Sequence, residues 1–477
     1  MILELTQKQQ RALFPLTKKR IIVLGAGREG WSTYQFLRAV FPRKVIAVAD
    51  AQELKNWSAE FQNAINNDQK LRFYSGKSYV DCLDQYDLVF KSPGISKEIE
   101  PLNTLLEKKQ IELTSNTAWF LKLNKGITVG VTGTKGKSTT SSLIYHVLSN
   151  NNVKSVLIGN IGVPPLSMLG EITSKTVVVM EMSAHQLCDL KASPHIAIIH
   201  DITREHLDFF HTMDKYVWAK GPICAYQKKN DFVIYNPNFA NPSKLAAVSP
   251  AKHIHFAAKD APGISAYADN KTVFYKEQNG LVESVVNLRQ VKLRGAHNIQ
   301  NILPTVIVAK HFKLTGEQIN NAIKTFSPLK HRLEWVGKVN EVDYYNDSLA
   351  TTPESVMAAM RTFMNRKIIL LAGGLERHQD YTDLAEMIAR RKLPAIILFP
   401  TTGQRLADNI ISASKKLEVR PPVFYHVESM QEAIDAAAKI AKPDTVVLLS
   451  PGAASFNTFI DYADRGNQFA TQVKNLI

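Results

Sequence analysis

Cysteine is scarce in this chain: among 477 residues there are only Cys82, Cys188 and Cys224. They are far apart and include no C-x-x-C pair, so they are too few for the disulfide framework on which small secreted domains depend. The scarcity therefore predicts a protein of the reducing cytoplasm.

Long hydrophobic runs are missing as well. No apolar stretch reaches the roughly 18 residues that a membrane-spanning helix needs, and the first 20 residues lack the basic-then-apolar pattern of a signal peptide. There is no long Pro, Ser, Gln or Asn tract, which argues against disordered, collagen-like and coiled-coil classes. We expect a globular protein that is neither secreted nor inserted in a membrane.

Basic residues, by contrast, are in excess: 58 Lys and Arg stand against 43 Asp and Glu, a formal net charge of +15. Such an excess favours anionic partners, which could be nucleic acid, an anionic membrane or phosphorylated small molecules. Charge alone does not choose among them. At roughly 100–200 residues per domain, the length predicts about three domains.

Short β-branched runs alternate with helix-like stretches in three successive units, which is the pattern of α/β domains with parallel sheets. The first unit, residues 1–120, contains IIVLG, KVIAVAD and YDLVFKS. The second, 121–327, opens with GITVGVTG, and the third, 328–477, contains KIILLAGG and TVVLLSPG. Residues from about 248 to 293 are predicted to form short strands and turns rather than helices.

The strongest motif lies where a strand passes into a Gly-rich loop and a helix, in the run GVTGTKGKST at 130–139. Small residues let backbone N–H groups approach phosphate oxygens, and the helix N-terminus favours negative charge. Lys137 can reach the β- and γ-phosphates, and Ser138 or Thr139 can ligate Mg²⁺. Val131 departs from the strict G-x-x-x-x-G-K-S pattern, but a purely structural turn would not need Lys-Ser at the helix start. The motif predicts an ATP site.

A second Gly-rich loop, GAGREG at 25–30, follows the strand-like run IIVL, and Asp50 ends the next strand. This spacing matches the G-x-G-x-x-G dinucleotide fingerprint. Taken alone it indicates NAD, although any nucleotide with a diphosphate and a ribose would satisfy the same strand-turn-helix. Another loop, KSPGI at 91–95, follows YDLVF at the carboxyl end of a strand, where α/β ligands bind; an ordinary turn is the alternative.

Polar residues follow several other predicted strands. Glu181 closes KTVVVMEMS and His206 follows HIAIIHD, and beside a P-loop such groups suit hard cations that bridge phosphates and an acyl oxygen. Asn298 and Asn301 precede an apolar helix and would share one face of it, where they could contact a base edge or act as caps. The runs DSLATTP at 347–353 and SPGAAS at 450–455 are candidate anion or ribose contacts, or simple caps.

The chain resembles the Mur ligase family in a series of motifs that occur in this order: GTKGKSTT, EMSAHQL, REHLD, GAHNIQN, HRLEW, NDSLAT and LLSPGAASFNTFIDYADRGNQF. The resemblance covers nearly the whole chain. Within the family, the chain is most similar to the MurD-like branch. The resemblance implies a Rossmann-like UDP-sugar domain, a central P-loop domain that binds ATP and a Rossmann-like C-terminal domain that binds glutamate. The implied reaction is ATP-dependent amide-bond formation between UDP-N-acetylmuramoyl-L-alanine and D-glutamate through an acyl phosphate, in peptidoglycan precursor synthesis.

The resemblance also implies a role for each matching residue. ATP would be bound by Gly133, Thr134, Lys135, Gly136, Lys137, Ser138, Thr139, Asn298, Asn301, Arg332 and Asp347. Two Mg²⁺ ions would be held with the help of Ser138, Glu181, His206 and a carbamylated Lys220, and the catalytic set would be Lys137, Glu181, His206 and Lys220. The UDP-sugar substrate would contact Gly25, Gly27, Arg28, Gly30, Asp50, Ser92, Pro93, Gly94, Asn160 and His206. Glutamate would contact Thr351, Arg377, Ser455 and Tyr462, and an Arg suits a carboxylate because a guanidinium can grip it with two bonds.

Three positions depart from the commonest pattern of this branch. Leu349 and Arg377 each stand where a Lys is usual, and Lys135 stands where an Asn is usual. Leu349, Arg377 and the run SPGAASF are similar to a sister branch that adds L-glutamate, so L-glutamate is the alternative substrate.

Two rivals come from other classes. If the protein were an NAD-dependent oxidoreductase, GAGREG and Asp50 would form an NAD site, but the P-loop would have no function. A nucleic-acid-binding ATPase would explain the charge, but the sequence has no recognition-helix, RNP-like or zinc signature. We expect a cytoplasmic monomer with small-molecule substrates and no nucleic-acid partner.

Overall fold

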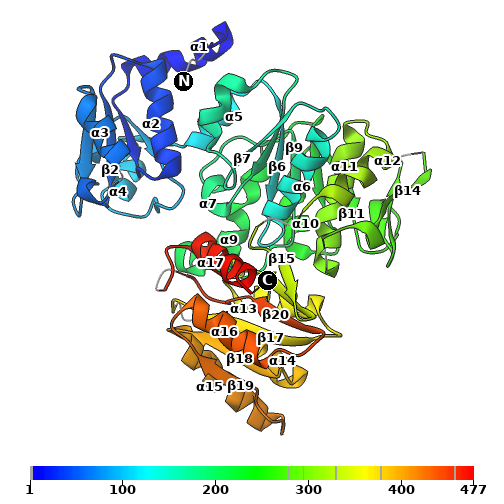
Figure 1. Ribbon diagram of the computed structural model, residues 1–477. Coiled ribbons are helices and arrows are strands. Elements are labelled where there is room, and N and C mark those ends of the chain that lie inside the picture. The colour runs from blue at the N-terminus through cyan, green and yellow to red at the C-terminus, as the bar shows by residue number, and fades with distance from the viewer. Residues whose placement is uncertain are drawn as a thin grey trace. The chain divides into compact units, whose positions relative to one another are not determined.

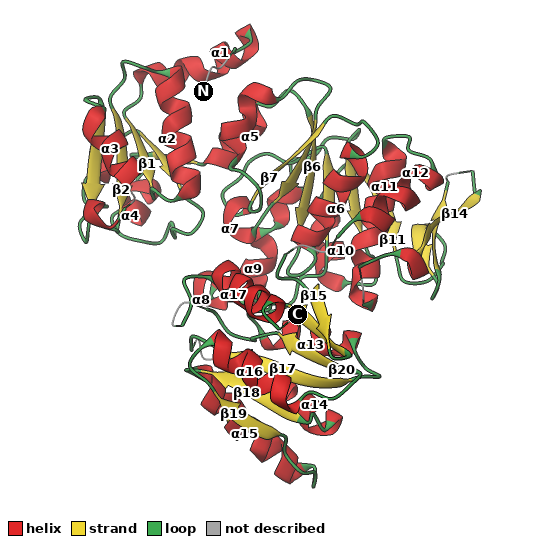
Figure 2. Cartoon of the chain, in the orientation of Figure 1, coloured by secondary structure: helices red, strands yellow, loops and turns green. Residues whose placement is uncertain are grey.

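A computed structural model of the chain describes residues 4–57, 59–277, 279–293, 295–327, 330–376, 379–455 and 458–476. Within these ranges lie three sheets, each with helices packed beside it (Figures 1 and 2). The chain divides into two compact units: the first is Met1–Gln290 with Gln300–Lys324, and the second is Val291–Ile299 with Thr325–Ile477. The first unit contains two of the sheets and the second unit contains the third.

The first sheet is parallel, with the strand order β3-β2-β1-β4-β5. Its central strands are buried because helices cover both faces, which is why they consist of unbroken apolar runs such as IIVL. The strand order reverses between β1 and β4, so the loops after these two strands flank the crevice where such sheets bind ligands. The strands are β1 (Ile21–Leu24), β2 (Ile46–Asp50), β3 (Leu71–Ser75), β4 (Leu88–Lys91) and β5 (Glu112–Thr114), and the helices are α1 (Gln7–Leu13), α2 (Arg28–Val40), α3 (Ala59–Asn67), α4 (Leu102–Glu107) and α5 (Asn116–Leu123).

The second sheet has nine strands in the order β14-β13-β12-β11-β10-β9-β6-β8-β7. It is parallel from β7 to β12 and continues into antiparallel β13 and β14. Its strands are β6 (Ile127–Thr132), β7 (Ser155–Gly159), β8 (Val177–Glu181), β9 (Ile196–Ile199), β10 (Phe232–Tyr235), β11 (Lys252–Phe256), β12 (Ile264–Ala268), β13 (Thr272–Lys276) and β14 (Val282–Asn287). The helices are α6 (Lys137–Ser149), α7 (Ala184–Leu187), α8 (Leu207–Phe210), α9 (Met213–Ala219), α10 (Ala240–Ala246), α11 (Ile299–His311) and α12 (Gly316–Thr325).

The third sheet, in the second unit, has the order β15-β16-β20-β17-β18-β19, with only β15 antiparallel to its neighbour. Apolar clusters cover both of its faces. The strands are β15 (Glu334–Val339), β16 (Val342–Asn346), β17 (Lys367–Gly373), β18 (Ala395–Phe399), β19 (Val423–His426) and β20 (Thr445–Leu449). The helices are α13 (Pro353–Thr362), α14 (Thr382–Arg391), α15 (Thr402–Lys416), α16 (Met430–Ile440) and α17 (Tyr462–Lys474).

The α/β architecture that the sequence predicts is confirmed, including the short strands β11 to β14 between residues 248 and 293. The domain limits at 120/121 and 327/328 stay predictions; α5 has residues on both sides of the first limit. In the described ranges, no helix is long and apolar enough to cross a membrane.

Candidate active site

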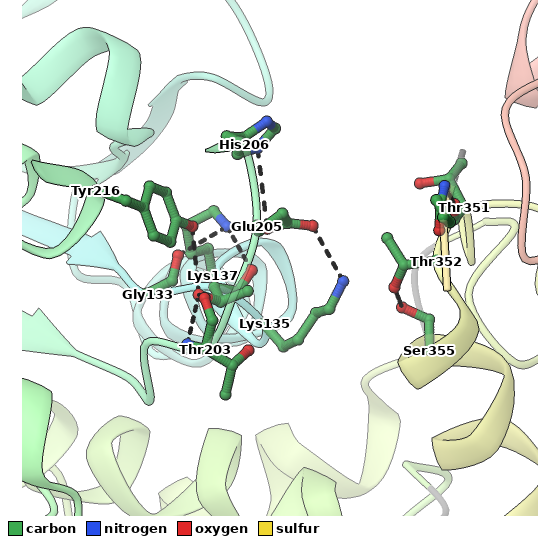
Figure 3. Close-up of polar contacts among 12 residues, drawn as sticks. Gly133, Lys135, Lys137, Thr203, Glu205, His206, Tyr216, Thr351, Thr352 and Ser355 are labelled. Carbon is green, nitrogen blue, oxygen red and sulfur yellow. Dashed lines mark hydrogen bonds and ion pairs between the residues drawn. The ribbon is translucent and has the colours of Figure 1, made fainter. Parts of the chain in front are cut away.

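The Gly-rich loop after β6 forms a tight cradle at the N-terminus of α6 (Figure 3). Gly133 and Gly136 have φ values of +142° and +87°, which residues with a Cβ rarely adopt. A Cβ on Gly133 would lie 2.5 Å from the Cβ of His200, and one on Gly136 would lie 2.5 Å from Oδ1 of Asn301. Both glycines are therefore required by close contacts as well as by backbone conformation.

Two lysine amino groups converge on this loop. Nζ of Lys137 donates to the carbonyl oxygens of Gly133, at 3.0 Å, and Thr134, at 2.8 Å. Nζ of Lys220 donates to the same Gly133 oxygen at 3.0 Å and lies 4.5 Å from the ring centre of Tyr216. Burial of Lys220, aided by the charge of Lys137, lowers the pKa of its amino group well below the ordinary value. The site thus contains a shielded amine that loses its proton more readily than an exposed lysine does.

Glu181 ends β8 and is 1% exposed. Its Oε1 accepts a hydrogen bond of 2.7 Å from Nδ2 of Asn160, whereas its buried Oε2 has no hydrogen-bond partner among the residues described. An unsatisfied buried carboxylate oxygen is costly, and a cation would relieve that cost.

The protein donors around this oxygen are few. No group of three or more His, Cys, Asp or Glu side chains in the described part of the chain could hold a metal ion by itself. Mg²⁺ commonly takes one or two carboxylates and completes its shell with water and substrate phosphates. Glu181, together with Ser138 in the first turn of α6, fits that kind of site.

A second acidic residue, Glu205, faces the P-loop from the segment before α8 (Figure 3). Its carboxylate lies 3.2 Å from Nζ of Lys135 and 3.8 Å from Nε2 of His206. Burial by itself would raise the pKa of Glu205, but the charges of Lys135, Lys137 and His206 outweigh burial and lower it. Glu205 is therefore held as a carboxylate, and the half-exposed imidazole of His206 lies beside it.

A buried chain of hydrogen bonds lies beneath the P-loop. Nε2 of His200 is 2.8 Å from Oγ1 of Thr140, and that hydroxyl donates to Oδ1 of Asn301 at 3.1 Å. Because the Thr140 hydroxyl has one hydrogen and gives it to Asn301, His200 must donate from Nε2. Burial, with a smaller effect from Lys137, lowers the pKa of His200 to about 3, which keeps the imidazole neutral.

The two loops of the first sheet also meet. Gly25 has a φ of +92°, and its carbonyl oxygen accepts a hydrogen bond of 2.9 Å from Oγ of Ser92. The carboxylate of Asp50, at the end of β2, accepts a hydrogen bond from the backbone N–H of Ala26 at 2.7 Å and so holds the Gly25–Gly30 loop in place. The guanidinium of Arg28 donates to the backbone oxygen of Asn160 at 3.1 Å. Since the Asn160 side chain bonds Glu181, these contacts connect the first Gly-rich loop with the P-loop sheet.

The second unit has its own cluster at the carboxyl ends of β16 and β20. Asp347 accepts hydrogen bonds from the backbone N–H of Leu333 at 3.1 Å and from Oγ of Ser450 at 2.9 Å. Arg465 is fully buried and donates to Oγ and O of Ser348, at 3.0 and 2.9 Å, and to the carbonyl oxygen of Ala453, at 3.2 Å. Its guanidinium therefore joins the loop after β16 to the loop after β20.

Other residues of the second unit surround these loops. Ser455 is buried, and Tyr462 begins α17 with its side chain partly exposed and its backbone oxygen bonded to Oγ of Ser348. The backbone oxygen of Thr351 accepts from the side chain of Gln379, and Oγ1 of Thr352 lies 3.1 Å from Oγ of Ser355 (Figure 3).

Comparison with known proteins identifies the family. The Mur ligase middle domain model matches residues 131–309, and the Mur ligase, glutamate ligase domain model matches residues 331–452. Over 465 residues the chain is 32% identical to the UDP-N-acetylmuramoylalanine--D-glutamate ligase of Clostridium perfringens, which covers 96% of this chain and 97% of that protein. The chain belongs to the Mur ligase family.

Other relatives of this Mur ligase agree. A protein of the same name from Halalkalibacterium halodurans is 31% identical, with 96% of this chain and 98% of that protein covered. Two solved structures share the fold: a MurF ligase from Thermotoga maritima in complex with ADP (TM-score 0.58, 15% identity, 97% of each chain) and a MurC from Thermotoga maritima (TM-score 0.56, 18% identity, 96% and 99% of the chains).

The structure of this Mur ligase brings many of the sequence-predicted residues together. Within the first unit, the P-loop, Glu181, Lys220, Asn160, Asn301 and the Gly25–Gly30 loop are linked by the contacts above. In the second unit Asn298 ends a short 3-10 helix. The pKa of the neighbouring His297 is lowered by burial and, to a smaller extent, by the charge of Arg332. Whether Asn298 and Asn301 share a face stays a prediction, because they belong to different units. Arg377 lies outside the described residues.

Sequence reasoning missed three residues. Glu205 directly precedes the predicted His206, and His200 ends the apolar run HIAIIH, so both carried a local signal. Arg465, within the run DYADRGNQF, reads as an ordinary exposed helix residue, and only tertiary contacts reveal its role.

Proposed function

We propose that this Mur ligase uses ATP to join UDP-N-acetylmuramoyl-L-alanine to D-glutamate through an amide bond. The observation that carries the proposal is the convergence of Lys137 and Lys220 on the Gly133 carbonyl beside the buried, half-satisfied carboxylate of Glu181. A site of this kind suits phosphoryl transfer to a carboxylate, and the named relatives are glutamate ligases of this substrate.

In the first step, the alanyl carboxylate would attack the γ-phosphorus of ATP to give an acyl phosphate and ADP. The backbone N–H groups of residues 133–139 and the amino group of Lys137 would stabilise the negative charge on the transferring phosphoryl group. The amine of glutamate would then attack the acyl carbon. The tetrahedral intermediate would collapse with loss of phosphate, leaving the amide.

Lys220 has a separate proposed role. Its neutral amine would attack CO₂, forming an N–C bond and releasing one proton, so that the buried neutral amine becomes a carbamate anion beside Glu181. The site would then contain two anionic groups, the Glu181 carboxylate and the carbamate, instead of Glu181 alone. Two anionic oxygen donors suit a divalent cation better than one carboxylate and a lysine do. We propose two Mg²⁺ ions, held by Ser138, Glu181, carbamylated Lys220 and His206. The metal would neutralise charge that develops on the phosphoryl group.

Substrate contacts follow from the two Gly-rich loops and the second unit. The UDP-sugar would bind where the loops after β1 and β4 meet, at Gly25–Gly30 and Ser92–Gly94, with Arg28 supplying positive charge for the diphosphate. Thr351, Ser455, Tyr462 and Arg377 would receive glutamate. We further propose that the protein acts as a monomer in the cytoplasm.

L-glutamate is the second candidate, favoured by Leu349 and Arg377. Both enantiomers present the same two carboxylates and one amine, so residue types alone do not separate them.

The test is a phosphate-release assay on the purified full chain with ATP, Mg²⁺, UDP-N-acetylmuramoyl-L-alanine and either enantiomer of glutamate. We expect release only when all components are present, with D-glutamate preferred. Preference for L-glutamate would transfer the assignment to the second candidate, and absence of release with both would refute the proposal. Submillimolar binding of NAD would revive the oxidoreductase rival.

A further inference from the structure

An amphipathic segment lies at the edge of the first unit (Figure 1). Helix α1 continues directly into a 3-10 helix, Phe14–Lys18. Its inner side consists of Gln9, Leu13 and Leu16, which are 4%, 2% and 2% exposed. Nε2 of Gln9 donates to the backbone oxygen of Leu123 at the end of α5, at 2.7 Å. Nζ of Lys44 donates to the backbone oxygen of Thr17 at 2.9 Å, so the segment is fixed to the unit at both of its ends.

The opposite side carries positive charge. Lys8, Arg11 and Lys18 are exposed and recur at the spacing of one helix face. From residue 5 to residue 20 the chain has five basic residues and no acidic one. Two of the five are neutralised, because Lys19 pairs with Glu112 and Arg20 pairs with Asp87. Lys8, Arg11 and Lys18 have no ion-pair partner in the part of the chain that the structure describes.

An aromatic side chain stands among these cations. Phe14 is 63% exposed and occupies the next position of the same face, three residues after Arg11. One exposed apolar residue is ordinary on a protein surface. A ring placed between Arg11 and Lys18 is the arrangement that peripheral membrane-binding helices use, with cations for lipid phosphates and a ring for the acyl boundary.

A pocket of about 520 Å³ adjoins the segment. Leu16, Leu113 and Trp119 contribute apolar walls, and Lys122 and Lys191 contribute further cations. Nζ of Lys122 lies 4.3 Å from the ring centre of Trp119. Glu112 also lines the pocket, but it is already paired with Lys19. The pocket lies on the Leu16 side of the segment, and none of Lys8, Arg11, Phe14 and Lys18 lines it.

We propose that this face, formed by Lys8, Arg11, Phe14 and Lys18, binds reversibly to the surface of an anionic phospholipid bilayer. Each basic side chain is attracted by the negative surface potential of the bilayer, and transfer of the Phe14 ring out of water adds favourable binding free energy. Nucleic acid would engage the cations but would leave the exposed ring of Phe14 in water. The binding is independent of the proposed ligase reaction and gives a role to part of the +15 charge.

The test is co-sedimentation of the full chain with vesicles of phosphatidylglycerol and phosphatidylcholine, compared with pure phosphatidylcholine vesicles. We expect binding to the anionic vesicles alone, and weaker binding as salt shortens the screening length. The variant K8E/R11E/K18E should lose about a hundredfold in affinity and Phe14→Ser about tenfold.

A charge-matched control separates this face from net charge. The variant K415E/K416E/K439E changes the charge equally at exposed lysines of the second unit and should retain binding. All substituted side chains are exposed, and unchanged thermal unfolding would confirm that each variant folds. Equal binding to both vesicle types, or equal losses in the two triple variants, would overturn the proposal. Competition by a DNA or RNA oligonucleotide with no effect of Phe14→Ser would assign the face to nucleic acid and would overturn it too.

Discussion

Lys137 and Lys220 donate hydrogen bonds to the same acceptor, the carbonyl oxygen of Gly133, each at 3.0 Å. Burial, aided by repulsion from the charge of Lys137, lowers the pKa of the Lys220 amino group well below its ordinary value. This pair joins the P-loop to the end of α9, and it connects the phosphate cradle with the residue proposed for carbamylation.

The first prediction concerns Lys220. Lys220→Ala should lower kcat by at least about a hundredfold, because it removes the amine that would carry the proposed carbamate. Added acetate should restore part of the rate by supplying a carboxylate in the vacated space. The matched control is Lys215→Ala, which replaces an exposed lysine of α9, the helix that ends directly before Lys220, and should keep normal activity. Wild-type rates for Lys220→Ala would refute the role.

Two glycines of the GAGREG loop provide a steric comparison. A Cβ on Gly30 would lie 1.7 Å from the backbone oxygen of Gly25, whereas one on Gly27 would meet nothing within 4 Å. Gly30→Ala should therefore reduce the free energy of unfolding by more than about 2 kcal/mol, and Gly27→Ala should change it by less than about 0.5 kcal/mol. Urea unfolding followed by tryptophan fluorescence measures both. Similar values for the two variants would contradict the packing described here.

His200 should make stability depend on pH. Burial lowers the folded-state pKa of its imidazole to about 3 from an ordinary value of 6.5. Between these values the unfolded chain holds a proton that the folded chain does not, so the free energy of unfolding falls as pH falls through the window. The slope due to this residue is up to about 1.4 kcal/mol per pH unit. His200→Gln can still donate to Thr140 but does not titrate.

Urea midpoints measured from pH 7 to pH 5 should therefore decline more steeply for the wild type than for His200→Gln. Parallel curves would show that His200 does not titrate in this way.

Arg465 should act on the proposed glutamate site through the two loops that it joins. Arg465→Lys keeps a positive charge but cannot make all three of the observed hydrogen bonds, so we expect a loss of at least about 2 kcal/mol in unfolding free energy. KM for glutamate should rise while KM for ATP stays near the wild-type value. Arg361→Lys, at an exposed position of α13, is the control. An equal rise in both KM values would indicate general disruption instead.

Local signals explain what the sequence predicted well. The run from Ile127 to Ser149 contains a buried strand, a loop with two glycines and a helix in unbroken succession, and the structure confirms that order as β6, loop and α6. The strand-like runs before Asp50, Glu181 and Asp347 are confirmed in the same way. Period and composition suffice for such segments because each element is recognisable within a few residues.

The features that the sequence did not predict depend on long-range contacts. The Gly133–Lys220 hydrogen bond joins residues 87 positions apart, and no spacing rule anticipates it. Arg465 has the composition of a surface residue, yet it is fully buried because backbone oxygens of distant loops accept its protons. Asp50 illustrates a further case: its carboxylate accepts from the backbone N–H groups of Ala26 and Gln52, and the loop spacing did not predict these two contacts.

The most direct test of the central claim is mass spectrometry of the reaction product. The full chain is incubated with ATP, Mg²⁺, UDP-N-acetylmuramoyl-L-alanine and isotopically labelled D-glutamate or L-glutamate in parallel. We predict a UDP-sugar product that has gained one glutamate residue, formed faster from the D-enantiomer and only with ATP. Faster formation from L-glutamate would move the protein to the alternative substrate, and the absence of any glutamyl product from either enantiomer would contradict the account.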